Sequence, residues 1–133
     1  MRWRNIAFMA VVVVFILSGP AVSQDWVDVK DPKELRALHS NKTFRWLSPL
    51  PHPLLEHFRA DGKGILVYTA DQRQIPCTWE VKGNDQVCVS SETGTRCFRF
   101  QHSKKNPDEY VKRSTDVEAI MMIFKVEDGI PQF

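Results

Sequence analysis

Cysteine is scarce in this sequence, and Cys77, Cys88 and Cys97 are the only three. No two of them have the Cys-x-x-Cys spacing of zinc sites and thioredoxin-like redox centres. The histidines also lack the His-x-His and i, i+4 spacings that metal ligands show. We therefore predict that no metal is bound and that the histidines are solvated surface residues. They are His39, His52, His57 and His102.

Motifs of the common catalytic classes are missing as well. The sequence has no Gly-x-Ser-x-Gly nucleophile elbow and no recognisable Ser/Lys pair. The segment 61–64, Asp-Gly-Lys-Gly, has the composition of a turn and not the pattern of a phosphate-binding loop. We therefore predict that the protein is not an enzyme and carries no cofactor.

A long apolar run occurs once, at residues 6–17, directly after Arg2 and Arg4. A Ser-Gly-Pro break and the small residues Ala21 and Ser23 follow it, which is the pattern of a secretory signal peptide. The alternative is an uncleaved anchor, but a membrane-spanning helix needs about 20 apolar residues. We predict a signal peptide at 1–23, a single periplasmic or secreted domain at 24–133, and no stable membrane span after cleavage.

The predicted mature domain has no excess of charge of either sign. The whole sequence has 18 basic and 16 acidic residues, and removing Arg2 and Arg4 with the signal leaves sixteen of each. Nucleic-acid-binding domains need a basic surface that neutralises phosphates. We therefore predict no nucleic-acid partner.

The segment 75–100, which contains all three cysteines, is the centre of the predicted fold. Apolar residues alternate with polar ones along much of it, and turns near Gly83 and Gly94 interrupt the alternation. This pattern predicts three consecutive antiparallel strands joined by two turns.

The second of these hairpins has a register that can be tested. With the turn centred in segment 90–95, Cys88 lies opposite Cys97 on one face, and Val87 lies opposite Phe98 on the other. Directly opposed antiparallel residues have the Cα separation that a disulfide requires. We predict a Cys88–Cys97 disulfide, which leaves Cys77 as a free thiol.

Cys77 has more than one interpretation. We favour a small buried apolar residue on the same face as Trp79. The alternatives are a nucleophile or redox sensor, an intermolecular disulfide partner, and a bond to Cys88 or Cys97 in place of the predicted pairing.

The remaining elements are read from caps, turns and periodicity. Asp31 as a helix cap and Pro32 in the first turn predict a short helix over 31–39, which packs over one end of a sheet. Further strands are predicted at 43–47, 54–59, 64–69, 109–113 and 119–126, with an Asp-Gly hairpin turn at 61–62. The proline-rich segment 48–53 is interpreted as an extended loop. The fold class is mainly β, an antiparallel meander closing toward a lipocalin-like barrel, with one short N-terminal helix.

The order of these motifs resembles a family of small secreted alphaproteobacterial proteins of unknown function with a lipocalin-like β-meander. The resemblance implies a fold and a compartment and brings no catalytic residue. One departure is that Cys77 and Thr78 stand just before the Trp-x-Val motif, where the family pattern has a glycine. The matching motifs are residues 34–38, 42–44, 58, 61–62, 79–81, 83–84, 87–89 and 97–100.

Aromatic residues are more numerous on the predicted strands than a few turns require. We interpret them as core, and an incompletely filled interior of a small barrel can also hold an apolar ligand. The candidate core or ligand-lining residues are Trp46, Phe58, Tyr68, Trp79, Phe98 and Phe100.

These observations favour a non-catalytic exported protein that acts in binding or as an envelope accessory. Its partner is predicted to be a small apolar ligand or another envelope protein. A second hypothesis is a periplasmic inhibitor of a cell-wall or host hydrolase that uses an exposed loop at 49–53 or 90–95. A Cys77-dependent redox enzyme is the third.

Overall fold

The computed structural model describes residues 25–48, 52, 54–117 and 121–133. The predicted signal peptide and most of the proline-rich segment lie outside these residues. In chain order the elements are β1 (Trp26–Val29), α2 (Pro32–His39), β2 (Lys42–Ser48), β3 (Leu54–Phe58), β4 (Lys63–Tyr68), β5 (Arg73–Lys82), β6 (Gln86–Ser91), β7 (Gly94–Ser103), β8 (Glu109–Ser114) and β9 (Met121–Asp128).

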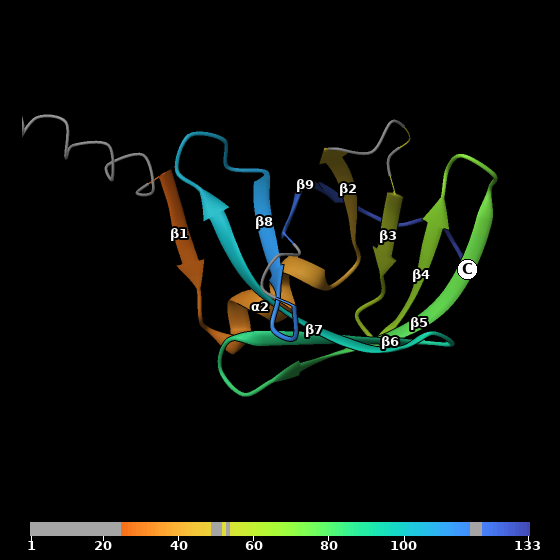
Figure 1. Ribbon diagram of the computed structural model, residues 1–133, viewed down its shortest axis with the longest axis horizontal. Coiled ribbons are helices and arrows are strands. Elements are labelled where there is room, and N and C mark those ends of the chain that lie inside the picture. The colour runs from red at the N-terminus through yellow and green to blue at the C-terminus, as the bar shows by residue number, and fades with distance from the viewer. Residues whose placement is uncertain (1–24, 49–51, 53, 118–120) are drawn as a thin grey trace, which may run out of the picture.

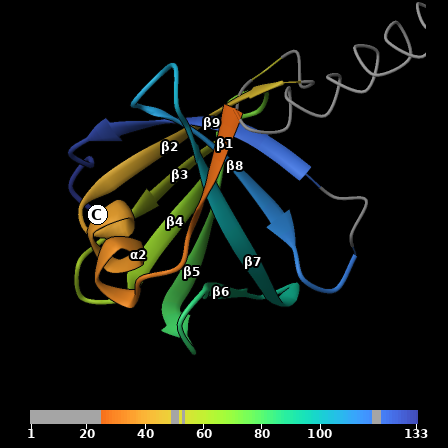
Figure 2. The same cartoon turned by 90° about the vertical axis from the view of Figure 1, so that its left-hand side faces the viewer.

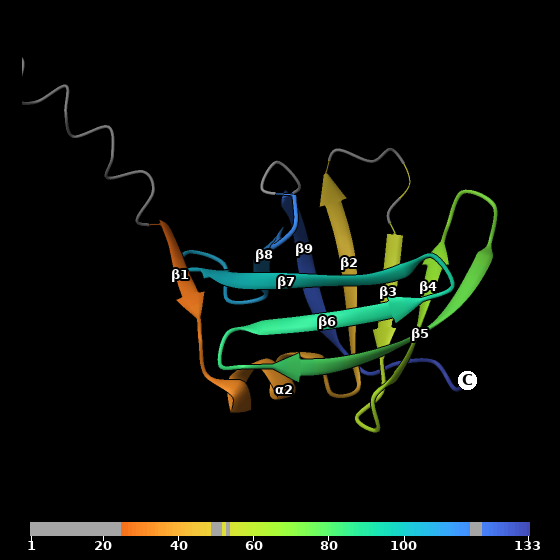
Figure 3. The same cartoon turned by 60° about the horizontal axis from the view of Figure 1, so that its bottom comes forward.

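Strands β2 to β9 form a closed eight-stranded antiparallel barrel. Sequential strands pair with one another around most of the ring, β2 also pairs with β9, and pairing between β7 and β8 completes the ring. In Figure 3, β5, β6 and β7 cross in front of β2, β3 and β9, so the barrel is flattened into two halves with crossed strands. The predicted fold class is confirmed.

β1 adds a ninth strand that the sequence analysis did not predict. It pairs antiparallel with β7, from Val29 opposite Phe100 to Trp26 opposite Ser103. The pairing of β6 with β7 ends before this stretch, at Val87 opposite Phe98. β1 therefore occupies the side of β7 that β6 leaves open. A four-residue segment in which apolar and polar residues alternate only once is too weak a pattern to predict a strand when its partner strand is unknown.

The long strand β5 is shared between the two halves of the barrel. It begins at Arg73, before the predicted segment 75–100, and Pro76 lies inside it. Pro76 is tolerated because it pairs with Ile65 of β4 only, and pairing with β6 begins one residue later, at Cys77 and Ser91.

The central hairpin has the predicted register. Cys88 lies opposite Cys97 and Val87 opposite Phe98, and the two cysteines form a disulfide. Val87 and Phe98 belong to the buried core, so the disulfide and the apolar residues are on opposite faces of the hairpin. The bond joins adjacent strands of the barrel and ties β6 to β7 near their shared turn.

Removing this disulfide is expected to destabilise the fold without changing it. The Cys88→Ser/Cys97→Ser variant should lose about 2–3 kcal/mol of unfolding free energy, because the bond closes a loop with a sequence separation of nine residues. Urea denaturation followed by tryptophan fluorescence measures the loss, and Cys77→Ala serves as the control that leaves the disulfide intact. Equal stability of the double variant and the natural protein would contradict the expectation.

The helix α2 covers one end of the barrel, as predicted (Figures 1 and 2). Asp31 caps it by accepting a hydrogen bond from the backbone N–H of Lys33, and Ser40 ends it. Leu35, Leu38 and His39 are its buried residues. A two-turn helix has little stability of its own, so this buried face holds it in place.

The interpretation of His39 as a surface residue is wrong. Its side chain is 1% exposed and lies among four aromatic rings. The ring centroids are 4.8 Å from Phe44, 5.0 Å from Phe58, 5.2 Å from Trp79 and 5.1 Å from Phe100. Its Nδ1 bonds the backbone carbonyl of Leu35 at 2.8 Å, which satisfies a carbonyl near the end of the helix.

His57 is also buried, on the outer side of β3, where its Nδ1 bonds the Thr43 hydroxyl at 2.7 Å. Neither burial is recognisable from the sequence, since a lone histidine on a short amphipathic segment has the same pattern whether it is buried or solvated. His52 is exposed, as interpreted.

Burial makes the fold sensitive to acid through His39. Desolvation lowers the pKa of His39 from 6.5 to about 3. Below pH 6.5 the unfolded chain therefore binds a proton that the folded chain does not, and stability falls as the pH is lowered toward 3. Between pH 7 and pH 4.5 the loss should be about 2–3 kcal/mol from this residue.

Urea unfolding at the two pH values measures this loss, and His39→Gln should flatten the pH dependence while lowering stability at pH 7. The matched control is His52→Gln at an exposed position, which should keep the natural slope. An unchanged slope in His39→Gln would show that other groups cause the acid sensitivity.

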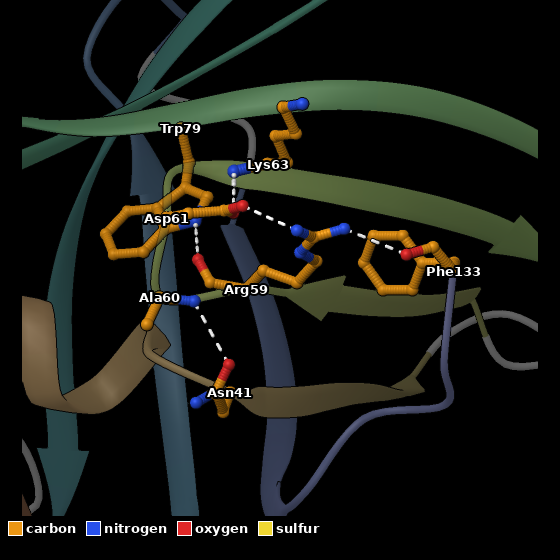
Figure 4. A network of polar contacts seen from close by, with 7 residues as sticks. All are labelled: Asn41, Arg59, Ala60, Asp61, Lys63, Trp79 and Phe133. Atoms are coloured by element: carbon orange, nitrogen blue, oxygen red, sulfur yellow. Dashed lines mark hydrogen bonds and ion pairs between the residues drawn. The ribbon is translucent and has the colours of Figure 1, made fainter.

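A polar network joins the end of α2 to the β3–β4 turn (Figure 4). Asn41 accepts a hydrogen bond from the Ala60 backbone at 3.1 Å, and the indole N–H of Trp79 donates to the Arg59 carbonyl at 2.8 Å. The Arg59 guanidinium lies between Asp61 and the backbone oxygen of Phe133, with donor distances of 2.6 and 2.8 Å. These contacts hold the end of the barrel that α2 covers.

Candidate binding cavity

The interior of the barrel has a filled part and an open part. Next to α2 the aromatic core is tightly packed, with Phe44, Phe58 and Phe124 fully buried. Farther from the helix the side chains leave a cavity of about 520 Å³. Its lining residues are Trp46, Leu54, Glu56, Leu66, Tyr68, Val89, Ser91, Thr93, Gly94, Thr95, Arg96, Phe98, Lys112 and Met122.

The cavity lies toward the end of the barrel opposite α2. Because neighbouring strands are antiparallel, the β4–β5 and β6–β7 turns are both at that end. Tyr68 and Ser91 are the last residues of their strands, and Gly94 is the first of its strand. These three residues are next to the β4–β5 and β6–β7 turns, so the two turns lie at the mouth of the cavity.

An ion pair crosses the barrel between the cavity and the aromatic core. Glu56 is on β3 and Lys112 is on β8, and these strands are separated by β2 and β9 on one side of the ring and by four strands on the other. The Lys112 Nζ is 2.6 Å from Glu56 Oε1, and the two side chains are 1% and 5% exposed. Two buried charges of opposite sign thus join opposite walls.

Aromatic side chains surround this pair. The indole N–H of Trp46 donates to the same Glu56 oxygen at 2.7 Å. The Lys112 Nζ lies 4.5 Å from the ring centroid of Phe98, 5.3 Å from that of Trp46 and 5.8 Å from that of Phe124. Aromatic faces are electron-rich and attract a cation, so they partly replace the water that the ammonium loses on burial.

Neither member of the pair was predicted from the sequence. Side chains alternate between the two faces of a strand, so Lys112 shares its face with Tyr110 and Ser114, and Glu56 shares its face with Leu54 and Phe58. A glutamate in register with two apolar core residues was the available signal. This signal does not predict the ion pair, because Lys112 lies fifty-six residues away in the sequence.

Breaking the ion pair on one side should cost more than removing it from both. Lys112→Met leaves Glu56 as an uncompensated buried carboxylate and should destabilise the fold by about 3–5 kcal/mol. Lys112→Met/Glu56→Gln should recover much of this loss, because no buried charge remains and the glutamine oxygen can still accept from Trp46. Thermal or urea unfolding of the two variants checks the order, and a double variant less stable than the single one would contradict it.

The six aromatic residues predicted as core or ligand-lining divide between the two parts of the interior. Trp46, Tyr68 and Phe98 line the cavity. The other three are buried in the core beside α2 and are not cavity-lining. These are Phe58, Trp79 and Phe100.

Cys77 is a free, buried thiol that faces the core together with Trp79. Burial raises the pKa of the thiol to about 11, and the nearby Glu56 carboxylate acts in the same direction. Because the thiolate is the nucleophilic form, this environment disfavours a catalytic or redox role. A bond to Cys88 or Cys97 is not formed, since those two bond each other.

Gly64 of β4 makes room for Cys77. The two residues are directly opposed, and a Cβ atom on Gly64 would lie 2.9 Å from the Cys77 sulfur and 2.8 Å from the His57 carbonyl oxygen. The Cys77 side chain is thus accommodated by a glycine on the neighbouring strand.

Among the described residues, no cluster of three His, Cys, Asp or Glu side chains is arranged to hold a metal ion. Within the same ranges, none of the helices has the length and apolar character needed to cross a membrane. Comparison with protein-family models, with curated proteins and with solved structures gives no match to this chain.

Proposed function

We propose that this protein is a non-catalytic exported binding protein that holds a small apolar ligand inside its barrel. The observation that carries the proposal is the cavity of about 520 Å³ at the end opposite α2. Small-molecule sites are typically clefts of about 300–1,000 Å³ with mainly apolar walls and a few polar groups. The cavity agrees with this description in both size and lining.

The walls of the cavity favour an apolar ligand body. Aliphatic, aromatic and thioether side chains come from β2, β3, β4, β6, β7 and β9, so apolar surface surrounds the space on several sides. Polar residues cluster at the rim around the β6–β7 turn, at Ser91, Thr93 and Thr95. An apolar molecule inside the cavity would be removed from water by the walls, which is the favourable term in its binding.

Two features support export to the periplasm or beyond. The N-terminal sequence has the pattern of a signal peptide. The Cys88–Cys97 disulfide ties two strands together, and disulfides persist in oxidising compartments such as the periplasm.

Filling the cavity should abolish ligand binding while leaving the barrel folded. Leu66 lines the cavity, whereas Val67, the next residue of β4, points to the outer face. Leu66→Trp should therefore reduce binding of an environment-sensitive naphthalene dye by at least about tenfold, a loss of about 1.4 kcal/mol or more. Fluorescence titration measures the affinity, and circular dichroism verifies the fold.

Val67→Trp is the matched control, because it adds the same side chain one residue away, outside the cavity. It should bind the dye like the natural protein. Equal binding by both variants would show that the dye does not occupy the cavity. Native mass spectrometry of protein purified from the periplasm should then show a bound small molecule that Leu66→Trp lacks.

The inhibitor hypothesis has one supporting observation. The β6–β7 turn is exposed at Glu92 and Thr93, and hydrogen bonds between Ser90 and Thr95 (2.8 Å) and between Ser91 and Thr93 (2.9 Å) order it above the disulfide. A rigid exposed turn suits insertion into an enzyme cleft. Recovery of a stoichiometric hydrolase partner from the periplasm, with no bound small molecule, would favour this function over ligand binding.

A further inference from the structure

We infer that the ligand is a neutral amphiphile, an apolar chain ending in a hydroxyl or a primary amide, whose head group bonds both Lys112 and Glu56. The inference rests on the proposed function, since it names the chemical class of the molecule that the cavity takes. It is carried by the two buried charged side chains that line the inner end of the cavity.

Lys112 has hydrogen-bonding capacity left over. An ammonium group has three N–H donors. Among the described residues its one hydrogen bond is to Glu56 Oε1, and the ring faces of Trp46 and Phe98 lie 5.3 and 4.5 Å from its Nζ. Two N–H groups of a side chain that is 1% exposed are therefore not bonded to oxygen or nitrogen. An oxygen atom of a ligand that reached this point would accept a charge-assisted hydrogen bond.

Glu56 has spare capacity on the opposite wall. Both of its hydrogen bonds in the described part of the chain, from Lys112 and from the Trp46 indole, end on Oε1. Every fully buried side-chain oxygen or nitrogen in this part of the chain has a partner. Oε2 has none there, so it is not fully buried, and Glu56 lines the cavity. The inner end of the cavity thus presents a donor and an acceptor side by side.

The neutrality of the pair selects a neutral head group. A ligand carboxylate at Lys112 would lie within a few ångströms of the Glu56 carboxylate, and a ligand ammonium at Glu56 would lie equally near Lys112. Either one would leave a net charge buried among aromatic side chains, where an unpaired charge is costly. A hydroxyl or a primary amide accepts from Lys112, donates to Glu56 and adds no charge.

The polar groups at the rim of the cavity bind the ligand head group less strongly than Lys112 and Glu56 do. Ser91 bonds Thr93 there, and Thr95 bonds Ser90. Arg96 is exposed and remains solvated at the mouth. Because hydrogen bonds to a desolvated ion are stronger than those to solvated neutral groups, the head group is held at the inner end, and the chain lies along the apolar walls.

Competition binding with ligands of one chain length tests the inference. Four compounds displace the naphthalene dye from the natural protein: an alkanol, its methyl ether, the alkanoate and the alkylamine. The alkanol should bind about tenfold or more tightly than each of the other three, because only it both donates and accepts without adding charge. The primary amide of the same chain should bind like the alkanol.

The variant Lys112→Met/Glu56→Gln removes both charges and keeps an acceptor for Trp46. It should still bind the dye, while the advantage of the alkanol over the methyl ether falls to about threefold or less. Arg96→Gln is the matched control at the rim and should keep the order of the natural protein. Tightest binding of the alkanoate, or an alkanol preference that survives in the double variant, would overturn the inference and leave the proposed function standing. Failure of the dye and all ligands to bind the natural protein would instead reject the proposed function.

Discussion

The buried ion pair between Lys112 and Glu56 separates the two parts of the barrel interior. On one side of it aromatic rings and the helix α2 fill the space, and on the other side the interior is open. Two charges at this depth are tolerated because they bond each other and because Trp46 and the surrounding ring faces replace lost hydration. The same arrangement places two charged groups inside the barrel, where a barrel of this size would otherwise have only apolar side chains.

The filled part of the interior depends on the packing of α2 against the barrel. α2 is too short to be stable alone, and it is held by the burial of Leu35, Leu38 and His39 against aromatic residues of the barrel. His39 contacts four rings and its Nδ1–H donates to a helix carbonyl, and its burial among the rings favours the neutral form of the imidazole. One end of the barrel is therefore closed by packing, and the chemistry available to a ligand is confined to the other end.

Local signals in the sequence were sufficient for much of the architecture. The cap at Asp31, the Asp61-Gly62 turn and the register of the β6–β7 hairpin each depend on residues close together in the chain, and each is confirmed. β1 and the buried histidines were missed for the opposite reason. Their structure depends on partners distant in sequence, such as β7 for β1 and the aromatic core for His39. A short segment has the same pattern with or without such a partner.

The sequence by itself determined the strand periodicity, the disulfide pairing and the helix that covers one end, because turn chemistry and two-residue alternation act over a few residues. Only the tertiary structure decided which aromatic residues fill the core and which line the cavity. Trp46 and Phe58 have the same pattern in the sequence, yet Trp46 lies at the cavity and Phe58 beneath it. Closure of the sheet brings together strands that are far apart in the sequence. It therefore decides where each residue lies along the barrel axis, and it places Glu56 next to Lys112.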